Sequence, residues 1–144
     1  MEVKYKEVKT ISEFIDAIRI RADVFIKEQR FQPGWEPDED DKFSRHFIAI
    51  ADGKIVSTAR FRETSKGQIK IERTATKKEY RGKGIGKGLL EFMLKKMAEL
   101  KPKKIILMSQ VQSQPFYEKY GFRAVSKPYD MYGVKHIDMA YTKK

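Results

Sequence analysis

The segment from Tyr80 to Leu90 holds the glycines and basic side chains with the clearest chemistry. It alternates glycine with basic or apolar residues, as Arg81, Gly82, Lys83, Gly84, Ile85, Gly86, Lys87 and Gly88. Glycine lets a backbone turn tightly and approach a ligand closely. The helical pattern that follows would offer unpaired N–H groups at its first turn, where anions bind. The segment therefore predicts a pyrophosphate cradle; the alternative is a flexible surface turn.

The spacing of these glycines distinguishes between known phosphate-binding loops. All four occupy even positions, from Gly82 to Gly88. A Walker A loop has two glycines five apart, and a dinucleotide fingerprint has glycines two and then three apart, so both need an odd interval. The pattern that fits is Arg/Gln-x-x-Gly-x-Gly/Ala, from Arg81 to Gly86. It resembles the pyrophosphate loop of the GNAT superfamily of acetyl-CoA-dependent N-acetyltransferases.

A second segment, from Gln110 to Phe122, carries the same resemblance. It is similar to the GNAT pattern N-x-x-A-x-x-x-Y-E-K-x-G-F, with Tyr117 at the tyrosine, but Gln110 replaces the asparagine and Ser113 the alanine. Residues 20–29 and 133–139 resemble the ElaA/YjcF-like branch, in which R-x-x-V-F-x-x-E-Q and G-I-x-H-I-x-M recur. The resemblance thus covers nearly the whole chain.

Length and composition favour one domain over residues 1–144. The sequence is 40% hydrophobic and contains no cysteine, which excludes disulfides, thiolate metal sites and a cysteine nucleophile. We expect no metal. Neither a signal peptide nor an apolar run of membrane-spanning length is visible, so we expect a cytoplasmic protein.

The net charge of +11 is concentrated in one part of the chain. Residues 77–104 contain ten basic and three acidic residues and so contribute +7. A basic surface of this kind can bind nucleic-acid phosphates or a polyanionic small ligand, or can simply face solvent. The glycine segment favours the small ligand, since CoA carries a pyrophosphate and a further phosphate.

Hydrophobic periodicity predicts the elements that must position these segments. Apolar residues at helical spacing indicate three helices. The first spans 11–27 and begins with a capping box formed by Thr10 and Glu13. The second begins at Ile85 and is ended by Pro102, and the third spans 114–120. Alternating or continuous apolar runs indicate strands over 2–8, 46–51, 54–62, 68–76, 104–109, 122–125 and 134–142. Asp52-Gly53 and Lys66-Gly67 mark turns, so residues 46–76 form an antiparallel meander.

The resemblance implies an α/β fold of mixed α+β type and a cofactor site within it. The GNAT-like fold has a central, mostly antiparallel sheet of six to seven strands with a splayed parallel pair, flanked by three to four helices. By resemblance the co-substrate is acetyl-CoA, with its pantetheine arm along the backbone of strand 69–76. The implied cofactor-binding residues are Thr74, Ala75, Thr76, Arg81, Gly82, Lys83, Gly84, Ile85, Gly86, Lys87, Gln110, Phe116 and Tyr117.

Two residues are candidates for proton transfer. Tyr117 matches the family's tyrosine beside the thioester sulfur, and a phenol can donate a proton at neutral pH; we expect it to be the general acid, against a core tyrosine as the alternative. Glu72 shares the strand parity of Thr74 and Thr76, so all three should face the cleft. Glu72 would accept the amine proton or anchor the substrate ammonium, or else pair with Arg60 or Arg62.

The sequence gives fewer indications of which residues bind the acceptor amine. His46 and His136 lie in predicted strands, and either could serve as a base or be structural. Arg21, Glu28 and Gln29 could line the substrate site or form salt bridges and helix caps. Residues 36–41 contain five acids, which would either attract a cationic substrate or form a solvated loop.

These expectations define one leading function and two alternatives. The leading one is an N-acetyltransferase in which a primary amine, on a small molecule or peptide, attacks the thioester directly in a ternary complex. The alternatives are a catalytically silent acyl-CoA-binding regulator and, ranked last because no recognisable motif supports it, a basic nucleic-acid-binding domain. The resemblance to relatives that form dimers implies that a homodimer is one candidate for the oligomeric state.

Overall fold

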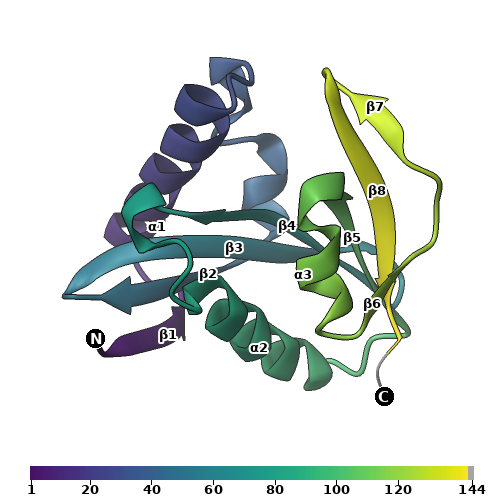
Figure 1. Cartoon of the computed structure of the whole chain (residues 1–144). Coiled ribbons are helices and arrows are strands. Elements are labelled where there is room, and N and C mark those ends of the chain that lie inside the picture. Colours follow the sequence, from purple (N-terminus) through teal and green to yellow (C-terminus); the bar gives the residue numbers. More distant parts are fainter. Residues whose placement is uncertain (143–144) are drawn as a thin grey trace.

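The computed structural model describes residues 1–142. In these residues one sheet contains eight strands in the order β1-β2-β3-β4-β5-β8-β6, with β7 also paired to β8 (Figure 1). The strands are β1 (Val3–Glu7), β2 (Arg45–Ala51), β3 (Lys54–Ser65), β4 (Gln68–Thr76), β5 (Lys104–Gln110), β6 (Phe122–Ala124), β7 (Tyr129–Met131) and β8 (Val134–Tyr141). The α-helices are α1 (Ile11–Arg21), α2 (Ile85–Ala98) and α3 (Gln114–Glu118). The expected fold class is confirmed, and β7 is the strand that the sequence did not predict.

The predicted first helix is interrupted halfway. Its start follows the predicted capping box, in which Thr10 Oγ1 accepts from the Glu13 backbone N–H at 3.1 Å and the Glu13 carboxylate accepts from the Thr10 backbone N–H at 3.1 Å. After Arg21 the chain continues as a π-helix, η1 (Ala22–Glu28). A π-helical turn is wider than an α-helical one and is frequently found at functional sites. The 3-10 helices η2 (Pro33–Trp35) and η3 (Glu39–Phe43) follow.

Strands β4 and β5 form the parallel pair among the described strands, and they separate partway. Their register runs from Gln68 opposite Lys104 to Ile71 opposite Leu107, and no pairing continues beyond it. Strand β4 nevertheless extends to Thr76 and β5 to Gln110. Each strand therefore keeps a free edge facing the opening between them, because β3 and β8 cover only the outer edges.

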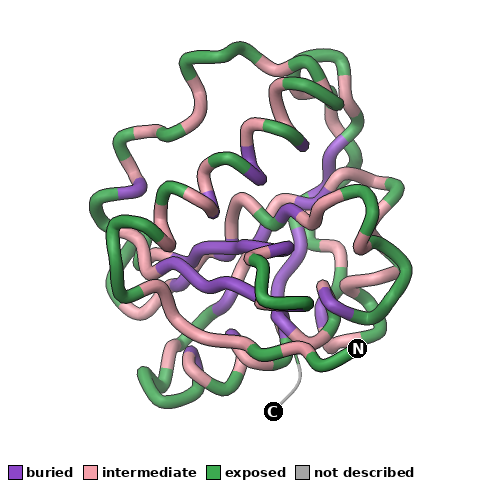
Figure 2. Tube along the Cα trace, turned by 90° about the vertical axis from the view of Figure 1, so that its left-hand side faces the viewer, coloured by how far each residue is buried: buried purple, intermediate pink, exposed green. Residues whose placement is uncertain are grey.

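Helices α1 and α2 cover opposite faces of the sheet (Figure 1). Helix α2 buries Leu89, Met93 and Met97 against Phe47 and Phe61 of the meander. On the other face, α1 and η1 bury Ile20 and Val24 against Ala75. Buried segments consequently run through the centre of the molecule along the strands (Figure 2). This two-sided burial, driven by apolar area removed from water, holds the edges of the β4–β5 opening in place.

Candidate functional site

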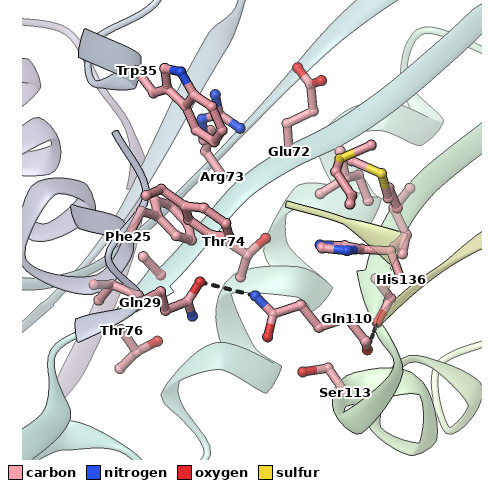
Figure 3. Close-up of a pocket in the computed structure, with 18 of the residues that line it drawn as sticks. Phe25, Gln29, Trp35, Glu72, Arg73, Thr74, Thr76, Gln110, Ser113 and His136 are labelled. Atoms are coloured by element: carbon pink, nitrogen blue, oxygen red, sulfur yellow. Dashed lines mark hydrogen bonds between the residues drawn. The ribbon is translucent and has the colours of Figure 1, made fainter. Parts of the chain in front are cut away.

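A cavity of about 900 Å³ occupies the opening between β4 and β5 (Figure 3). Its walls come from the free ends of both strands, from η1 and η2, from α3 and from the β7–β8 turn. The fold brings together here residues that lie far apart in the sequence. Of the residues expected at the site, the cavity is lined by Gln29, Glu72, Thr74, Ala75, Thr76, Arg81, Gly86, Gln110, Phe116, Tyr117 and His136.

The glycine segment forms a loop at one end of this cavity. Gly82 and Gly84 have φ of 76° and 80°, a left-handed conformation that favours glycine. Gly84 is the N-cap of α2, and no side chain caps the helix start. The first N–H groups of α2 therefore lack a side-chain partner, as an anion site requires. Lys83 and Lys87 are exposed beside them.

Gly88 has a different role from the loop glycines. A Cβ at this position would overlap the phenol of Tyr5. The glycine therefore lets α2 pack closely against β1. The regular spacing of four glycines in the sequence thus combines two purposes, loop conformation and helix packing.

Helix η1 contacts both sides of the cavity. The guanidinium of Arg81 donates to Glu28 at 2.8 Å and to the Thr76 carbonyl oxygen at 3.0 Å. The amide of Gln110 donates to Gln29 at 3.0 Å across the cavity (Figure 3). Glu28 and Gln29 were expected on the acceptor side, but these contacts tie them to the glycine loop and to the end of β5.

Tyr117 comes from α3 and lies in the cavity wall. Its ring packs edge-on against Phe116 and Phe122. Burial raises the pKa of Tyr117, although a hydrogen bond with the side chain of Thr74 acts in the opposite direction. A phenol with a raised pKa keeps its proton across the physiological range, so Tyr117 is protonated there.

The position of Glu72 corrects a sequence expectation. Arg73 has φ of 57°, and residues 73 and 74 together face only Ala59 of β3, so β4 contains a bulge. A bulge shifts strand parity by one residue, and Glu72 therefore lies on the opposite face from Thr76. It extends away from the Gln29–Gln110 contact (Figure 3).

Glu72 instead joins a group of ion pairs. It accepts from Arg62 Nε at 2.7 Å and from Arg60 at 3.0 Å, and Lys70 lies 3.5 Å away. Burial alone would raise the pKa of Glu72, but the hydrogen bond from Arg62 and the nearby positive charges lower it to about 2. A carboxylate of this kind is a poor proton acceptor at neutral pH. The ion-pair alternative with Arg60 and Arg62 therefore describes this residue.

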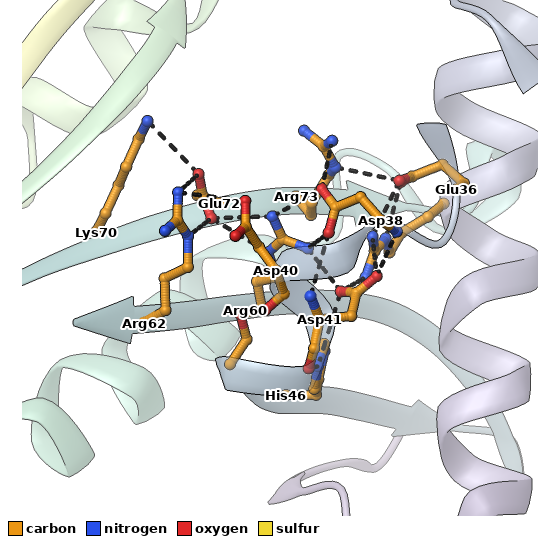
Figure 4. Close-up of polar contacts among 12 residues, drawn as sticks. Glu36, Asp38, Asp40, Asp41, His46, Arg60, Arg62, Lys70, Glu72 and Arg73 are labelled. Atoms are coloured by element: carbon orange, nitrogen blue, oxygen red, sulfur yellow. Dashed lines mark hydrogen bonds and ion pairs between the residues drawn. The ribbon is translucent and has the colours of Figure 1, made fainter. Parts of the chain in front are cut away.

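Three of the five acids in segment 36–41, Glu36, Asp38 and Asp41, belong by their hydrogen bonds to the same group of ion pairs (Figure 4). Arg21, of which 1% is exposed, holds Glu36 at 2.8 Å and Asp41 at 2.8 Å. Arg60, equally buried, holds Asp38 at 2.7 Å and Asp41 at 2.6 Å. Arg21 is thus a buried structural residue, not a substrate contact. We call these residues the charge network: Arg21, Glu36, Asp38, Asp41, Arg60, Arg62, Lys70, Glu72 and Arg73.

The two histidines have different environments. His46 is buried away from the cavity, where Nε2 donates to the Asp41 carbonyl oxygen at 3.1 Å and Phe14 packs on the ring. Burial lowers the pKa of His46, so it is a neutral structural residue rather than a substrate contact. His136 lines the cavity, and its Nδ1 lies 2.9 Å from the Val134 carbonyl oxygen.

The cavity also contains residues that the sequence did not single out. Phe25, Phe31, Trp35 and Tyr132 form aromatic parts of its wall, and Met108 lies at the end of β5. Aromatic residues and methionine are also common in protein cores, so their type alone does not indicate a site. Their positions depend on the π-helix η1 and on β7, which periodicity did not predict. No helix in residues 1–142 has the length and apolarity to cross a membrane.

Comparisons with known proteins agree with this geometry. Residues 5–143 match the family model of the acetyltransferase (GNAT) domain. The chain is 34% identical to the uncharacterised N-acetyltransferase YjcF of Bacillus subtilis over 86% of this chain and 89% of that protein. Its fold is similar to the crystal structure of Escherichia coli ElaA, with a TM-score of 0.88 and 25% identity over 98% and 100% of the two chains.

A third similarity concerns a solved acyl-CoA N-acyltransferase from Pseudomonas aeruginosa. It has a TM-score of 0.80 and 27% identity over 98% of this chain and 99% of that one. The family match spans nearly the whole sequence and includes both the glycine loop and the Tyr117 segment. The chain belongs to the GNAT acetyltransferase family, as an N-acetyltransferase of the branch that contains YjcF and ElaA.

Proposed function

We propose that this chain, as one domain over residues 1–144, transfers an acetyl group from acetyl-CoA to a primary amine without a covalent enzyme intermediate. The observation that carries the proposal is the free edge of β4, which runs from the uncapped start of α2 to the phenol of Tyr117. The free edge offers backbone groups to an extended pantetheine arm, as an added strand would. When bound, acetyl-CoA supplies the activated acetyl thioester.

The residues that hold the cofactor divide into two groups. The backbone of the loop from Arg81 to Lys87 and the start of α2 hold the pyrophosphate. The guanidinium of Arg81 adds positive charge when it leaves its ion pair with Glu28. The backbone of Thr74 to Thr76 contacts the pantetheine arm. Phe116 and Gln110 border the thioester end of the cavity.

Tyr117 acts as general acid toward the leaving thiolate. The amine nitrogen forms the new bond to the acetyl carbon, the carbon–sulfur bond breaks, and the phenol proton passes to sulfur. The raised pKa of Tyr117 keeps that proton in place before the reaction. General acid catalysis of this kind contributes about 10²–10⁴-fold to rate.

His136 replaces Glu72 as the group that accepts the amine proton. A neutral imidazole whose Nδ1–H donates to the Val134 carbonyl oxygen has a lone pair on Nε2. No hydrogen bond to this Nε2 is found among the described residues, and the ring lies at the cavity (Figure 3). A histidine can therefore take the proton directly or through water.

The test is release of free CoA from acetyl-CoA in the presence of a panel of primary amines. Tyr117→Phe should lower kcat by about 10²–10⁴-fold and leave acetyl-CoA binding unchanged. His136→Gln should lower kcat by about 10²–10⁴-fold, because the amine proton then lacks its acceptor, and should leave acetyl-CoA binding unchanged. Tyr141→Phe is a matched control, because this tyrosine joins the same aromatic cluster through Phe122 but does not line the cavity.

Three results would contradict the proposal. Acetyl-CoA binding without turnover on any amine would indicate the catalytically silent regulator. Full activity of Tyr117→Phe would remove the assigned general acid. Salt-sensitive binding of duplex DNA or RNA that acetyl-CoA does not displace would indicate the nucleic-acid-binding alternative.

A further inference from the structure

Three aromatic side chains form one wall of the cavity at the end away from the glycine loop. Phe31 stacks on Trp35 with 5.4 Å between ring centroids, and Trp35 meets Tyr132 edge-on at 4.5 Å. We call Phe31, Trp35 and Tyr132 the aromatic wall. Phe31 and Trp35 belong to the segment after η1, whereas Tyr132 lies in the β7–β8 turn. The wall therefore joins two segments that are about 100 residues apart.

The aromatic wall and the proposed base line the same cavity. Tyr132 and His136 belong to the same hairpin, in which Met131 pairs with Val134 and Tyr129 with His136. An amine that reaches His136 and the thioester therefore extends the rest of its structure toward Tyr132 and Trp35. The wall is the surface that meets this part of the acceptor.

The charged groups at this end are paired with one another. Glu36 binds both Arg21 and Arg73, and Asp38 binds both Arg60 and Arg73. These carboxylates have no unmatched charge to attract a second ammonium group. Arg73 lines the same cavity as Trp35, and 30% of its side chain is exposed, so a further cation there would meet a like charge.

We infer that the acceptor is a primary amine that carries an uncharged aromatic group, whose ring packs against Trp35 between Phe31 and Tyr132. The inference rests on the proposed function and names its substrate class. Aromatic pairs prefer the stacked and edge-on arrangements that the wall already shows, and a bound ring would extend that array. Trp35 and Tyr132 then determine specificity for the acceptor.

A binding experiment tests this inference without turnover. Trp35 is the only tryptophan in the chain, so intrinsic tryptophan fluorescence reports on the wall alone. In the presence of CoA, 2-phenylethylamine should change this emission saturably, while butylamine and 1,4-diaminobutane should change it little. Saturable binding of the diamine in preference to the aromatic amine would overturn the inference.

Kinetics with variants provide the second test. Tyr132→Ala is suitable because 70% of this residue is exposed, so the fold does not depend on its burial. The variant should lower kcat/KM for 2-phenylethylamine about tenfold, which corresponds to about 1.4 kcal/mol, and leave kcat/KM for butylamine unchanged. Phe43→Ala is the matched control, since Phe43 is 77% exposed and outside the cavity.

The outcomes separate this inference from the proposed function. Binding of the aromatic amine without release of CoA would support the substrate class and contradict the acetyltransferase proposal. Acetylation of butylamine or 1,4-diaminobutane in preference to 2-phenylethylamine would support the acetyltransferase and contradict the aromatic class. An equal loss for both amines in Tyr132→Ala would also contradict it.

Discussion

Strand β4 borders two polar regions that differ in whether their groups already have partners. In the charge network, Asp41 has two arginine partners, and Glu72 has Arg60, Arg62 and Lys70 within 3.5 Å. In the cavity, the edge of β4 beyond Ile71, the start of α2 and Nε2 of His136 lack such partners. The network is mostly buried and the cavity is open, although five network residues, Glu36, Asp38, Lys70, Glu72 and Arg73, also line the cavity.

The difference indicates which polar groups serve structure and which serve chemistry. A buried charge is costly unless it is paired and hydrogen-bonded, so the network residues are committed to one another. Catalytic groups must instead remain available to substrate and hold protons that can move. Residue type alone therefore does not identify the catalytic carboxylate: Glu72 is acidic and lines the cavity, yet its environment makes it a structural residue.

The largest expected effect follows from breaking the network at Arg60. Arg60→Ala removes the shared partner of Asp38, Asp41 and Glu72 and leaves these carboxylates with fewer counter-charges. We expect a loss of about 3–5 kcal/mol in the free energy of unfolding, as found when one member of a buried ion pair is removed. Urea unfolding followed by circular dichroism measures it.

An exposed ion pair provides the control for Arg60→Ala. Arg19 and Asp16 lie 3.6 Å apart on the surface of α1, with 76% and 47% of their side chains exposed. Arg19→Ala should change stability by less than about 0.5 kcal/mol. If both variants unfold at the same urea concentration, the network does not stabilise the fold.

The network also shows where sequence reasoning succeeds and stops. Periodicity and capping predicted seven of the eight strands found in the described residues and the starts of α1 and α2, because these depend on neighbouring residues. The partners of the acidic segment were not predictable, since Arg21 and Arg60 approach it only after folding. The bulge at Arg73 reversed the expected orientation of Glu72, and a single residue of register shift leaves no clear pattern in the sequence.

Motifs located the residues at the glycine-loop end of the cavity better than those at the opposite end. The glycine loop and Tyr117 were found because their spacing is tied to a chemical role. The aromatic wall has no such spacing. Trp35 and Tyr132 come into contact because of the π-helix η1 and the short β7–β8 hairpin, and neither element has a clear pattern in the sequence. Three of the five residues expected at the acceptor, Arg21, Glu28 and His46, instead make structural or loop contacts.

The second expected effect is the response of stability to acid. The pKa values of Asp41 and Glu72 are about 2 in the folded protein, below their ordinary values of 3.8 and 4.5. Their ionised forms therefore stabilise the fold fully above about pH 5, and this contribution is lost as the pH falls from about 4.5 toward 2. At about 1.4 kcal/mol per pKa unit, Asp41 should account for about 2 kcal/mol of that loss and Glu72 for about 3 kcal/mol.

Unfolding by urea at a series of pH values measures this acid response. Asp41→Asn should be less stable at pH 7 and show a shallower decline below pH 4.5 than the unmodified protein. Asp130→Asn is the control, because Asp130 and its partner Lys135 are both about two-thirds exposed. An unchanged slope in Asp41→Asn would show that this carboxylate is not linked to folding.

The third expected effect separates the two kinds of glycine around α2. Gly88→Ala forces Tyr5 to move and should lower the free energy of unfolding by about 1–3 kcal/mol, as overpacking does. Gly84→Ala meets no neighbouring atom but requires a left-handed conformation, at a cost of about 1–2 kcal/mol. The two variants thus have similar stability costs for different reasons.

Acetyl-CoA affinity and a second substitution distinguish those reasons. Gly84→Ala should raise KM for acetyl-CoA, since the loop that holds the pyrophosphate is distorted, whereas Gly88→Ala should alter KM little. Shortening Tyr5 to leucine should restore stability to Gly88→Ala and not to Gly84→Ala. Restoration of both, or of neither, would mean that the overlap with Tyr5 does not explain Gly88.

The smallest expected effect concerns an ion pair at the glycine-loop end of the cavity. Glu28 holds Arg81 at 2.8 Å, with 34% and 42% of the side chains exposed, and the pyrophosphate would compete for the same guanidinium. Glu28→Gln should therefore tighten acetyl-CoA binding, by up to about fivefold, because an exposed ion pair contributes about 0.2–1 kcal/mol. Added salt should shrink the difference, since it screens the pair. In the Arg81→Ala background the same substitution should have no effect on the dissociation constant. Weaker binding by Glu28→Gln would instead show that Glu28 positions Arg81 for the phosphate, and the charge pair would then belong to the site rather than compete with it.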